Sequence, residues 1–516
     1  MSNATVFTAD LIGIDAVIMM VEADLGIATP NLIIIGDKLA PIQTSPDQRE
    51  ILRAALANCG TLLAPRKTVI EFHRGPIGGR PHPGCELAMA VAVLAAHGVF
   101  ETTGMLDSSM FWGELGLDGS IRPAVGTLSV VEAARNAGMR RVFVSAEVAK
   151  QAANIDGIYV IGVNSLAELI EGFKVDTEQP LRISPCEPRS FPAPSSLAPD
   201  MIDIQGMELP RFAAEVMAAG GHPLLLTGAA GTGKTMLARR LAGILPDLDD
   251  AQALETSKVH AVARRQIPNY LIRRPPVRMP HHTVSAAGLL GGGNPPRPGE
   301  VSLAHNGVLF LDELPEFPRA CIVGLSEAFE HGMVSIVRSR YATTYPARAL
   351  IVATMTTCPC GNLGETKRVC TCSASAIKRW SERVTGERIM AHFDMIVTTS
   401  KLEAGGVAPH HDISAKVRAR VELARERQRV RYNQTMIELN SQLTDATIHL
   451  APISKSASAL LDREINAAMG DRSPMAKAAR KLRLRAVART IADLGTRAPT
   501  SISSRHVQRA LELYNA

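Results

Sequence analysis

A glycine-rich segment near the middle of the chain constrains the fold more than any other feature. Residues 228–235 match GxxxxGK[ST], with an apolar run before them and a helix-like run after them. In that context backbone N–H groups turn toward a triphosphate, Lys234 reaches its β and γ phosphates, and the Thr235 hydroxyl ligates Mg²⁺. The N-terminus of the following helix adds positive charge there. The predicted nucleotide-binding residues are Gly228, Ala229, Ala230, Gly231, Thr232, Gly233, Lys234, Thr235 and, from the second motif, Asp312.

The second motif is an apolar strand, 308–311, that ends in two carboxylates. Asp312 is predicted to support the Mg²⁺ shell, and Glu313 to orient and polarise the attacking water. A third apolar strand ends near Thr356, where an ATPase of this layout places a polar sensor for the γ-phosphate. With Lys234, these three residues are the predicted catalytic set. ATP and Mg²⁺ are the predicted cofactors.

The length of 516 residues predicts two to four compact units. Short β-like runs alternate with alanine-rich helical runs in 1–175, which predicts a mixed α/β domain. Prolines and serines concentrated in 176–200 indicate a linker. Strands and helices alternate around the phosphate loop in 201–400, as expected of a three-layer ATPase core with a parallel sheet. Helical periodicity dominates 401–516, so a helical domain is expected to follow the ATPase core in the predicted α/β fold.

Charge and hydropathy exclude some classes of protein. The net charge of +6 permits nucleic-acid binding without demanding it. The longest apolar run, 87–96, is too short to span a bilayer and indicates a buried helix. The N-terminus has no basic segment of the kind that begins a signal peptide. We therefore expect a cytoplasmic protein that does not act in a membrane and whose cysteines stay reduced.

Longer motifs around this predicted site resemble those of a known family. The run from His281 to Gly293, continuing through 297–307 and 311–317, resembles the magnesium-chelatase-like AAA+ ATPases of the ComM (YifB) family. Residues 112–123 resemble the Lon-protease-like domain of the same family, and 487–494 match its helical lid. The resemblance covers nearly the whole chain.

The resemblance implies an N-terminal Lon-protease-like (ribosomal S5 domain 2-like) α/β domain, an AAA+ core and a C-terminal helical lid. It also implies a homo-hexameric ring with ATP bound between subunits. Such a ring drives branch migration of DNA during natural transformation and recombination, so branched or single-stranded DNA is the expected partner. The first alternative is a magnesium-chelatase ATPase subunit, which ordinarily lacks the Lon-like domain. The second is a scaffold whose assembly is switched by nucleotide.

Residues 332–346 form an alternating pattern of two strands around a turn that carries Arg338 and Arg340. In the family this segment corresponds to the hairpin that faces the pore of the ring. Two arginines on such a tip are predicted to grip DNA phosphates without reading sequence. The alternative is an ordinary solvated turn.

Four of the eight cysteines form two C-x-C pairs separated by nine residues. Four thiolates on a short loop satisfy the tetrahedral geometry of Zn²⁺, and a reducing compartment argues against disulfides. A structural zinc site is therefore one prediction, and free thiols are the alternative. The predicted ligands are Cys358, Cys360, Cys370 and Cys372, whereas Cys59, Cys85, Cys186 and Cys321 lack such grouping.

Three arginine positions of the family are altered in this chain. His392 stands where the family places the arginine finger, with Arg388 one helical turn upstream. At sensor 2 the aligned residue is Ala479, and Arg480 follows one position late. Ser326 replaces a third arginine. Because arginine fingers contribute a factor of about 10³ to 10⁵ to the rate, we expect secure ATP binding with slow hydrolysis, or a partner subunit that supplies an arginine finger.

Proteolysis is a rival function, since Lon-like domains elsewhere carry a Ser and Lys dyad. The matching segment, 79–87, has no serine. Cys85 is the one nucleophile in it, and no general base lies nearby in the sequence. The sequence therefore disfavours a protease.

Overall fold

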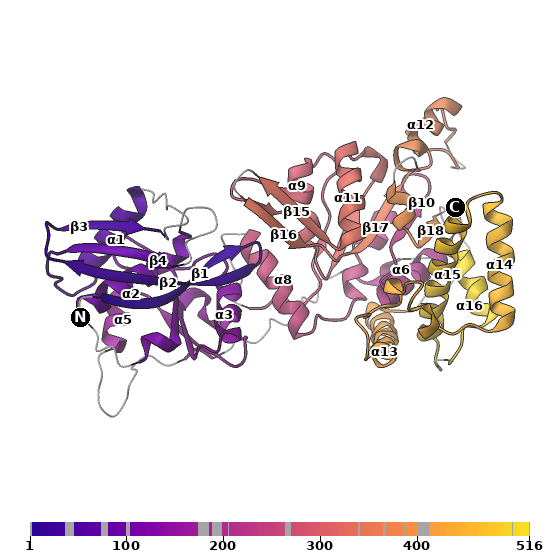
Figure 1. Cartoon of the computed structure of the whole chain (residues 1–516). Helices are drawn as coiled ribbons and strands as arrows, with labels where there is room; N and C mark the ends of the chain where they lie inside the picture. Colours follow the sequence, from indigo (N-terminus) through magenta and orange to yellow (C-terminus); the bar gives the residue numbers. More distant parts are fainter. Residues whose placement is uncertain are drawn as a thin grey trace.

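The computed structural model is elongated, and its three parts follow one another in chain order (Figure 1). It describes residues 3–36, 46–73, 81–99, 104–173, 185–187, 199–204, 206–263, 270–338, 341–364, 368–385, 388–399, 412–497 and 499–514. Most of the predicted linker, 176–200, lies outside these residues. Within the described residues, no helix is long and apolar enough to cross a membrane.

The N-terminal part is built on a mixed sheet. Its strands follow the order β3-β4-β2-β1-β5-β8-β9 within the described residues. The hairpin of β1 and β2 is antiparallel and pairs Asn3 with Asp24 at one end and Ile12 with Asp15 at the other. The strands are β1 (Asn3–Ile12), β2 (Asp15–Gly26), β3 (Asn31–Ile35), β4 (Lys67–His73), β5 (Ser109–Trp112), β8 (Arg141–Ser145) and β9 (Tyr159–Val163). The short strands β6 (Glu114–Leu115) and β7 (Ile121–Arg122) pair separately.

The helix α2 (Glu86–Ala96) forms the centre of the N-terminal core. Every residue of α2 is buried, as its run of alanine, valine, leucine and methionine predicts. It contacts β1, β2 and β5, so it covers the middle of the sheet. The other helices of this part are α1 (Pro46–Ala57), α3 (Thr127–Asn136), α4 (Ala146–Ala152) and α5 (Leu166–Phe173).

The central part contains a parallel sheet. Its strand order is β11-β14-β17-β10-β18 within the described residues, and each neighbouring pair is parallel. The inner strands are almost wholly apolar because helices bury both faces of such a sheet. The strands are β10 (Leu224–Thr227), β11 (Val277–Arg278), β14 (Val308–Leu311), β17 (Leu350–Met355) and β18 (Met395–Thr398).

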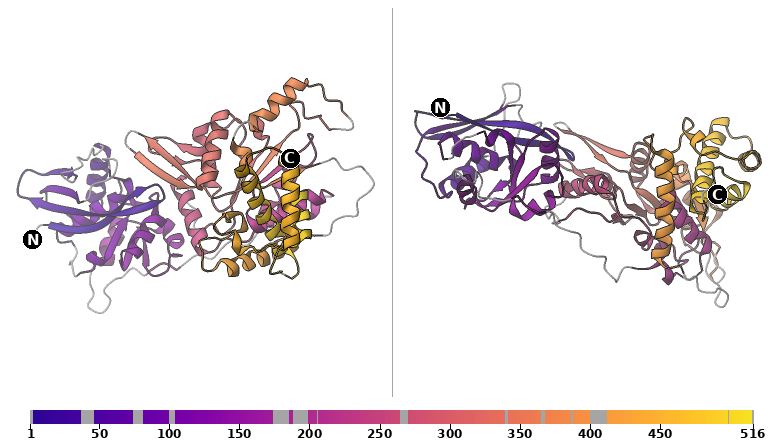
Figure 2. Two further views of the ribbon diagram at one scale, coloured as in Figure 1. Left: turned by 45° about the vertical axis from the view of Figure 1, so that its right-hand side comes forward. Right: turned by 90° about the horizontal axis from the view of Figure 1, so that it is seen from below.

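Helices and two hairpins surround the central sheet. One hairpin pairs β12 (Gly291–Gly292) with β13 (Arg297–Pro298), and the other pairs β15 (Met333–Arg338) with β16 (Tyr341–Pro346). The helices are α6 (Glu208–Gly220), α7 (Lys234–Ala238), α8 (Asp250–Ala263), α9 (Ala286–Leu290), α10 (Glu300–Leu303), α11 (Arg319–His331) and α12 (Ala374–Thr385). Figures 1 and 2 show α12 projecting from the body of the molecule.

The C-terminal part consists of helices that pack directly on the central part. Leu224 and Leu226 of β10 belong to the same hydrophobic core as Val487. Helix α6 contacts both α13 and α15, so it lies between the sheet and these helices. The helices are α13 (Ser414–Tyr432), α14 (Lys455–Met469), α15 (Pro474–Leu494) and α16 (Ser504–Glu512).

Helix α8 joins the central part to the N-terminal part. The Nζ atom of Lys258 lies 2.9 Å from Asp15 Oδ1 and 2.7 Å from Glu132 Oε2. Beside this ion pair, Ile14 from the turn between β1 and β2 shares a small core with Ile336 and Tyr345 of the β15–β16 hairpin. The N-terminal part is therefore in contact with the hairpin as well as with α8.

Candidate nucleotide site and cysteine cluster

The phosphate loop runs from the end of β10 to the start of α7. Gly228, Gly231 and Gly233 have φ angles of 144°, 76° and 89°. Residues with a Cβ rarely adopt these values, so the glycines are required by the path of the backbone. A Cβ on Gly228 would stand 2.4 Å from the carbonyl oxygen of Thr399, which blocks any larger residue.

Lys234 lies over this loop. Its Nζ atom donates to the carbonyl oxygens of Gly228, at 2.9 Å, and Ala229, at 2.8 Å. Burial lowers the pKa of Lys234, and the carboxylates of Asp312 and Glu313 act in the opposite direction. The ammonium group is therefore held against the backbone of the loop, where Asp312 and Glu313 act on it electrostatically.

The carboxylates of the second motif meet the phosphate loop at the C-terminal edge of the sheet. Thr235 Oγ1 donates to Asp312 Oδ2 at 3.1 Å. Asp312 Oδ1 accepts a shorter bond, 2.6 Å, from Thr354 Oγ1. Glu313 follows with a φ of 55° and an exposed side chain. The turn thus directs Asp312 toward the loop and leaves Glu313 open to water.

Thr354 is a site residue that the sequence reasoning missed. Its hydroxyl bridges the two acidic positions, because Oγ1 also accepts the backbone N–H of Glu313 at 2.9 Å. The predicted sensor, Thr356, lies two residues further on, and its carbonyl oxygen accepts a bond of 2.9 Å from Trp380 Nε1. A polar side chain within the otherwise apolar β17 was the available signal for Thr354.

The strand β18 supports the phosphate loop from its other side. Thr232 Oγ1 lies 2.6 Å from Thr399 Oγ1, and Thr399 in turn donates from its backbone N–H to the carbonyl oxygen of Thr227 at 2.7 Å. Nothing in the sequence around Thr399 indicated this contact, since it depends on β18 pairing with β10.

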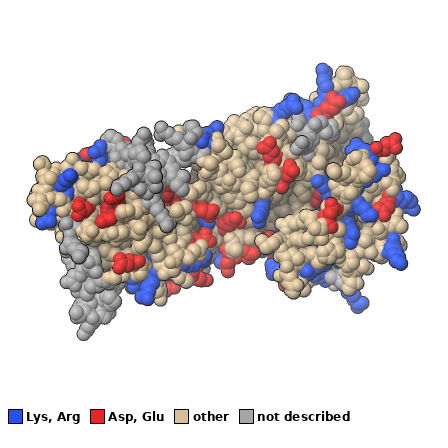
Figure 3. Space-filling model, in the orientation of Figure 1, with Lys and Arg blue, Asp and Glu red and all other residues tan. Residues whose placement is uncertain are grey.

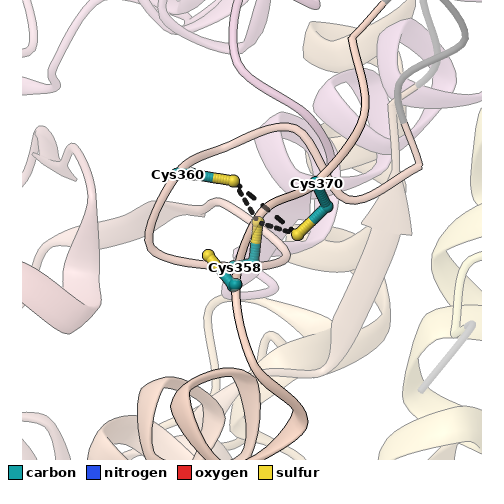
Figure 4. A group of neighbouring side chains, drawn as sticks. Cys358, Cys360 and Cys370 are labelled. Carbon is teal, nitrogen blue, oxygen red and sulfur yellow. Dashed lines mark hydrogen bonds between the residues drawn. The ribbon is translucent and has the colours of Figure 1, made fainter.

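The four predicted zinc ligands converge in space. Their sulfur atoms all lie within 4.8 Å of one another. Figure 4 shows the thiols of Cys358, Cys360 and Cys370 facing one another, with S···S distances of 3.4, 3.7 and 3.6 Å around the triangle. With Zn–S bonds of about 2.3 Å, a tetrahedral site has S···S edges of about 3.8 Å. The described geometry is consistent with zinc.

The loop that carries this cluster touches the phosphate loop. The backbone N–H of Ala230 donates to the carbonyl oxygen of Gly361 at 2.9 Å. Gly361 has a φ of 74°, and a Cβ placed on it would lie 3.0 Å from Ala230 Cβ. On the inner side, Cys358 is buried and its Sγ accepts the N–H of Leu363 at 3.3 Å. The cysteine cluster is thus adjacent to the candidate nucleotide site.

The predicted DNA-contacting arginines belong to the β15–β16 hairpin. Arg338 ends β15 and is exposed. Arg340 lies outside the described residues.

Two of the altered arginine positions contact each other. His392 Nε2 lies 3.0 Å from Ser326 Oγ, and the imidazole meets Phe329 edge to face. Burial lowers the pKa of His392, and the nearby Arg483 lowers it further. A neutral imidazole therefore occupies this position near pH 7. Arg480, which follows the expected sensor 2 position by one residue, lies over the ring of Tyr514.

Cys85 lacks the properties of a nucleophile. It is completely buried, and its Sγ donates to the carbonyl oxygen of Ala9 at 3.3 Å. Burial and the neighbouring Asp10 raise its thiol pKa. A thiol that is buried and protonated does not attack a substrate. These properties argue against a cysteine protease site here.

Three family models match consecutive stretches of the chain. "Magnesium chelatase, subunit ChlI" matches residues 200–407, which include the phosphate loop and the cysteine cluster. "Subunit ChlI of Mg-chelatase" matches 21–148, and "Magnesium chelatase, subunit ChlI C-terminal" matches 411–514.

Curated relatives are similar over most of their length. The protein named YifB from Salmonella typhimurium is 34% identical over 523 residues, which covers 99% of this chain and 97% of the relative. YifB from Escherichia coli is 34% identical and covers 86% and 85% of the two chains. The competence protein ComM from Haemophilus influenzae is 30% identical, with 86% of each chain covered.

Proposed function

This chain belongs to the magnesium-chelatase-like family that includes YifB and ComM, and from that premise we propose that it is an ATP-dependent AAA+ motor that acts on DNA. In this proposal the subunits form a hexameric ring that drives branch migration during natural transformation or recombination. The N-terminal sheet corresponds to the Lon-protease-like domain, and the C-terminal helices correspond to the lid.

The observation that carries the ATPase proposal is the contact between the two ATP motifs. Thr235 and Asp312 are separated by 77 residues in the chain, and their side chains are hydrogen-bonded at the edge of the parallel sheet. Ligands of open parallel sheets bind at this edge. A turn with only a structural role would not require a hydroxyl and a carboxylate positioned to bind the same cation.

The residues present fit ATP and Mg²⁺. Backbone N–H groups of 231–235 and the ammonium of Lys234 would hold the phosphates, and Thr235 with Asp312 would hold the cation. Bound Mg²⁺ supplies charge neutralisation for phosphoryl transfer. Glu313 is exposed next to Asp312, where its carboxylate orients the attacking water and accepts its proton.

The DNA part of the proposal is supported by the hairpin and by surface charge. Arg338 stands exposed at the end of β15, where it can contact phosphates. Figure 3 shows further Lys and Arg side chains on the projecting α12 and along the C-terminal helices. These charges favour a polyanion held by its backbone, which is how a translocating motor binds DNA.

Turnover is expected to be slow in a ring made only of this subunit. His392 carries no permanent charge and is bonded to Ser326, which occupies a second altered position. Neither side chain supplies the cation that stabilises the transition state in arginine-finger enzymes. A partner subunit that supplies an arginine would restore the rate.

The decisive experiment measures ATPase turnover with and without branched or single-stranded DNA. We expect DNA to increase turnover and Lys234→Ala to abolish it. Replacing Arg338 and Arg340 with alanine should remove the DNA stimulation and preserve nucleotide binding. Arg53→Ala, which alters an exposed arginine on α1 in the N-terminal part, is the control. Turnover that DNA does not change would contradict the proposal of a DNA motor.

A chelatase subunit is the second candidate, because the matching family models carry that description. Porphyrin-dependent stimulation of turnover would favour it over the DNA motor. A nucleotide-switched scaffold would instead show assembly that depends on ATP, without stimulation by DNA or porphyrin.

The proposal also includes one structural Zn²⁺ held by Cys358, Cys360, Cys370 and Cys372. It is supported by the convergence of the four thiols and by their S···S distances.

A further inference from the structure

The cysteine cluster and the candidate nucleotide site share a wall. Residues 358–363 form a tight turn that starts two residues after Thr356, and Thr357 Oγ1 closes it by donating to the carbonyl oxygen of Leu363 at 2.6 Å. The outer surface of this turn meets the phosphate loop through Gly361 and Ala230. The second pair of cysteines, at 370 and 372, reaches back to the same turn.

A second contact ties this region to the nucleotide loop. The backbone N–H of Gly228, the first residue of the loop, donates to the carbonyl oxygen of Met355 at 3.2 Å. The loop therefore rests on the segment that leads into the cluster at one end and on Gly361 near its middle. Anything that orders residues 355–363 also orders the loop.

We propose that Zn²⁺ bound by the four thiols orders this turn against the phosphate loop, so that zinc and nucleotide each increase the affinity of the chain for the other. The inference rests on the proposed ATP and zinc binding and adds a coupling between the two sites. Its physical basis is preorganisation, because a loop already held in its binding conformation loses less conformational entropy when the ligand binds.

Coupling of this kind is reciprocal. If zinc increases nucleotide affinity by some factor, nucleotide must increase zinc affinity by the same factor. One backbone hydrogen bond of ordinary net strength corresponds to roughly a three- to tenfold change in a dissociation constant. We therefore expect a factor of about three to ten in each direction.

The first measurement is metal content. The full chain, purified under reducing conditions, should contain about one zinc per chain, as expected for one four-cysteine site. Changing Cys370 and Cys372 to serine should remove the zinc, whereas Cys321→Ser should not, because Cys321 lies outside the cluster and its Sγ donates to the carbonyl oxygen of Val284. If the purified chain contains no zinc, the inference is wrong, whereas the proposal that the chain binds ATP is unaffected.

The second measurement is the affinity for a fluorescent ADP analogue, before and after a chelator removes the zinc. We expect affinity to fall three- to tenfold, on the hydrogen-bond scale given above, and to recover when zinc is returned. Equal affinities would overturn the coupling even if zinc is present. If the zinc-loaded chain binds no nucleotide, the proposed function fails and the coupling fails with it.

The reverse direction is tested by equilibrium competition for zinc with a chromogenic chelator. ADP should strengthen zinc retention by the same factor in the parent chain and should have no effect in Lys234→Ala. If zinc only stabilised the fold in general, ADP would not change the retention of zinc. An effect of ADP on zinc retention therefore indicates coupling between the two sites.

Two glycines provide a matched pair that leaves the thiols intact. Gly361 and Gly364 both have positive φ, at 74° and 87°, so alanine at either position has a similar backbone cost. A Cβ on Gly361 meets Ala230, whereas no atom lies within 4 Å of a Cβ on Gly364. Gly361→Ala should weaken the coupling with zinc retained, and Gly364→Ala should preserve it. Loss of the coupling in both variants, or in neither, would contradict the proposed contact.

Discussion

At the scale of single residues, the hydroxyl of Thr354 is a target for a functional test because it contacts the side chain of Asp312 and the backbone of Glu313. It donates to Asp312 and accepts the N–H of Glu313. The bond to Asp312 is charge-assisted, which makes it stronger than a neutral hydrogen bond. Thr354 is therefore a positioning residue for the carboxylate and for the turn that presents Glu313.

We predict that Thr354→Ala reduces ATP turnover by about 10- to 100-fold, the rate equivalent of the roughly 1.5–3 kcal/mol of a hydrogen bond to a charged group. Nucleotide affinity should change by less than about threefold, since Lys234 and the loop remain. Thr354→Ser should restore turnover. Turnover and nucleotide affinity measured on the same preparations separate the two effects.

Thr356→Ala is the informative comparison for that experiment. Thr356 was the predicted sensor, and its described hydrogen bond uses only the backbone carbonyl. If Thr356→Ala is the more damaging substitution for turnover, the sensor role belongs to Thr356 and the assignment to Thr354 is wrong.

The pair of His392 and Ser326 leads to a second prediction at this scale. Because a neutral imidazole stands where the resemblance places an arginine finger, His392→Arg should increase turnover by about 10-fold or more, a fraction of the roughly 10³- to 10⁵-fold contribution of tested arginine fingers. The measurement is DNA-stimulated ATPase activity. Ordinary AAA+ turnover by the parent chain, or complete loss of turnover in His392→Ala, would contradict a missing finger.

At the scale of elements, the stretch 82–86 that leads into α2 contains two titratable groups with opposite effects on stability. Burial lowers the pKa of His82 to about 4, and its Nδ1 accepts the N–H of Gly84 at 3.0 Å. Burial raises the pKa of Glu86 to about 7, and its Oε2 accepts the N–H of Leu115 at 2.9 Å.

The sign of each contribution to stability depends on whether the folded or the unfolded chain is protonated first as the pH falls. Below pH 6.5 the unfolded chain protonates His82 before the folded chain does, so stability falls as the pH drops toward 4. Below pH 7 the folded chain protonates Glu86 before the unfolded chain does, so stability rises as the pH drops toward 4.5. The two contributions oppose each other between pH 4.5 and 6.5.

We therefore predict opposite pH dependences for the two single variants. Relative to the parent chain, Glu86→Gln should lose stability as the pH falls from 6.5 to 4.5, and His82→Gln should gain stability. The slope for each group is up to about 1.4 kcal/mol per pH unit. Urea unfolding at several pH values measures it. Parallel curves of unfolding free energy against pH for the parent and both variants would show that folding does not change the pKa values of these groups.

At the scale of the whole molecule, the junction between the N-terminal and central parts includes a buried ammonium group, that of Lys258, beside the apolar contact of Ile14 with the hairpin. Burial alone would lower the pKa of Lys258, but its hydrogen bonds to Glu132 and Asp15 outweigh that effect and raise it. The raised pKa keeps the Lys258 ammonium charged across the ordinary pH range. Removing the ammonium leaves Glu132, which is mostly buried, without this partner.

We predict that Lys258→Met lowers the free energy of unfolding by about 1.5–3 kcal/mol, the scale of hydrogen bonds to charged groups, and weakens the coupling between the two parts. The chain has two tryptophans, Trp112 in β5 and Trp380 in α12, so single-tryptophan variants report on each part separately. Their unfolding midpoints should separate in the Lys258→Met background. Lys378→Met, at an exposed lysine, is the control.

The sequence by itself determined the elements whose signals are local. The phosphate loop, the strand ending in Asp312 and the paired cysteines are each contained in a few consecutive residues. Their chemistry can therefore be inferred without coordinates. The family resemblance was also carried by contiguous motifs, and the comparisons confirm it.

Only the tertiary structure decided which of these residues touch. The bonds of Thr354 to Asp312, of Thr232 to Thr399 and of Ala230 to Gly361 join positions that are 42, 167 and about 130 residues apart. The same applies to the contact between Ser326 and His392. The physical reason is that a parallel sheet brings the C-terminal ends of strands distant in sequence to one edge, and strand order is set by packing of the whole core rather than by local residue patterns.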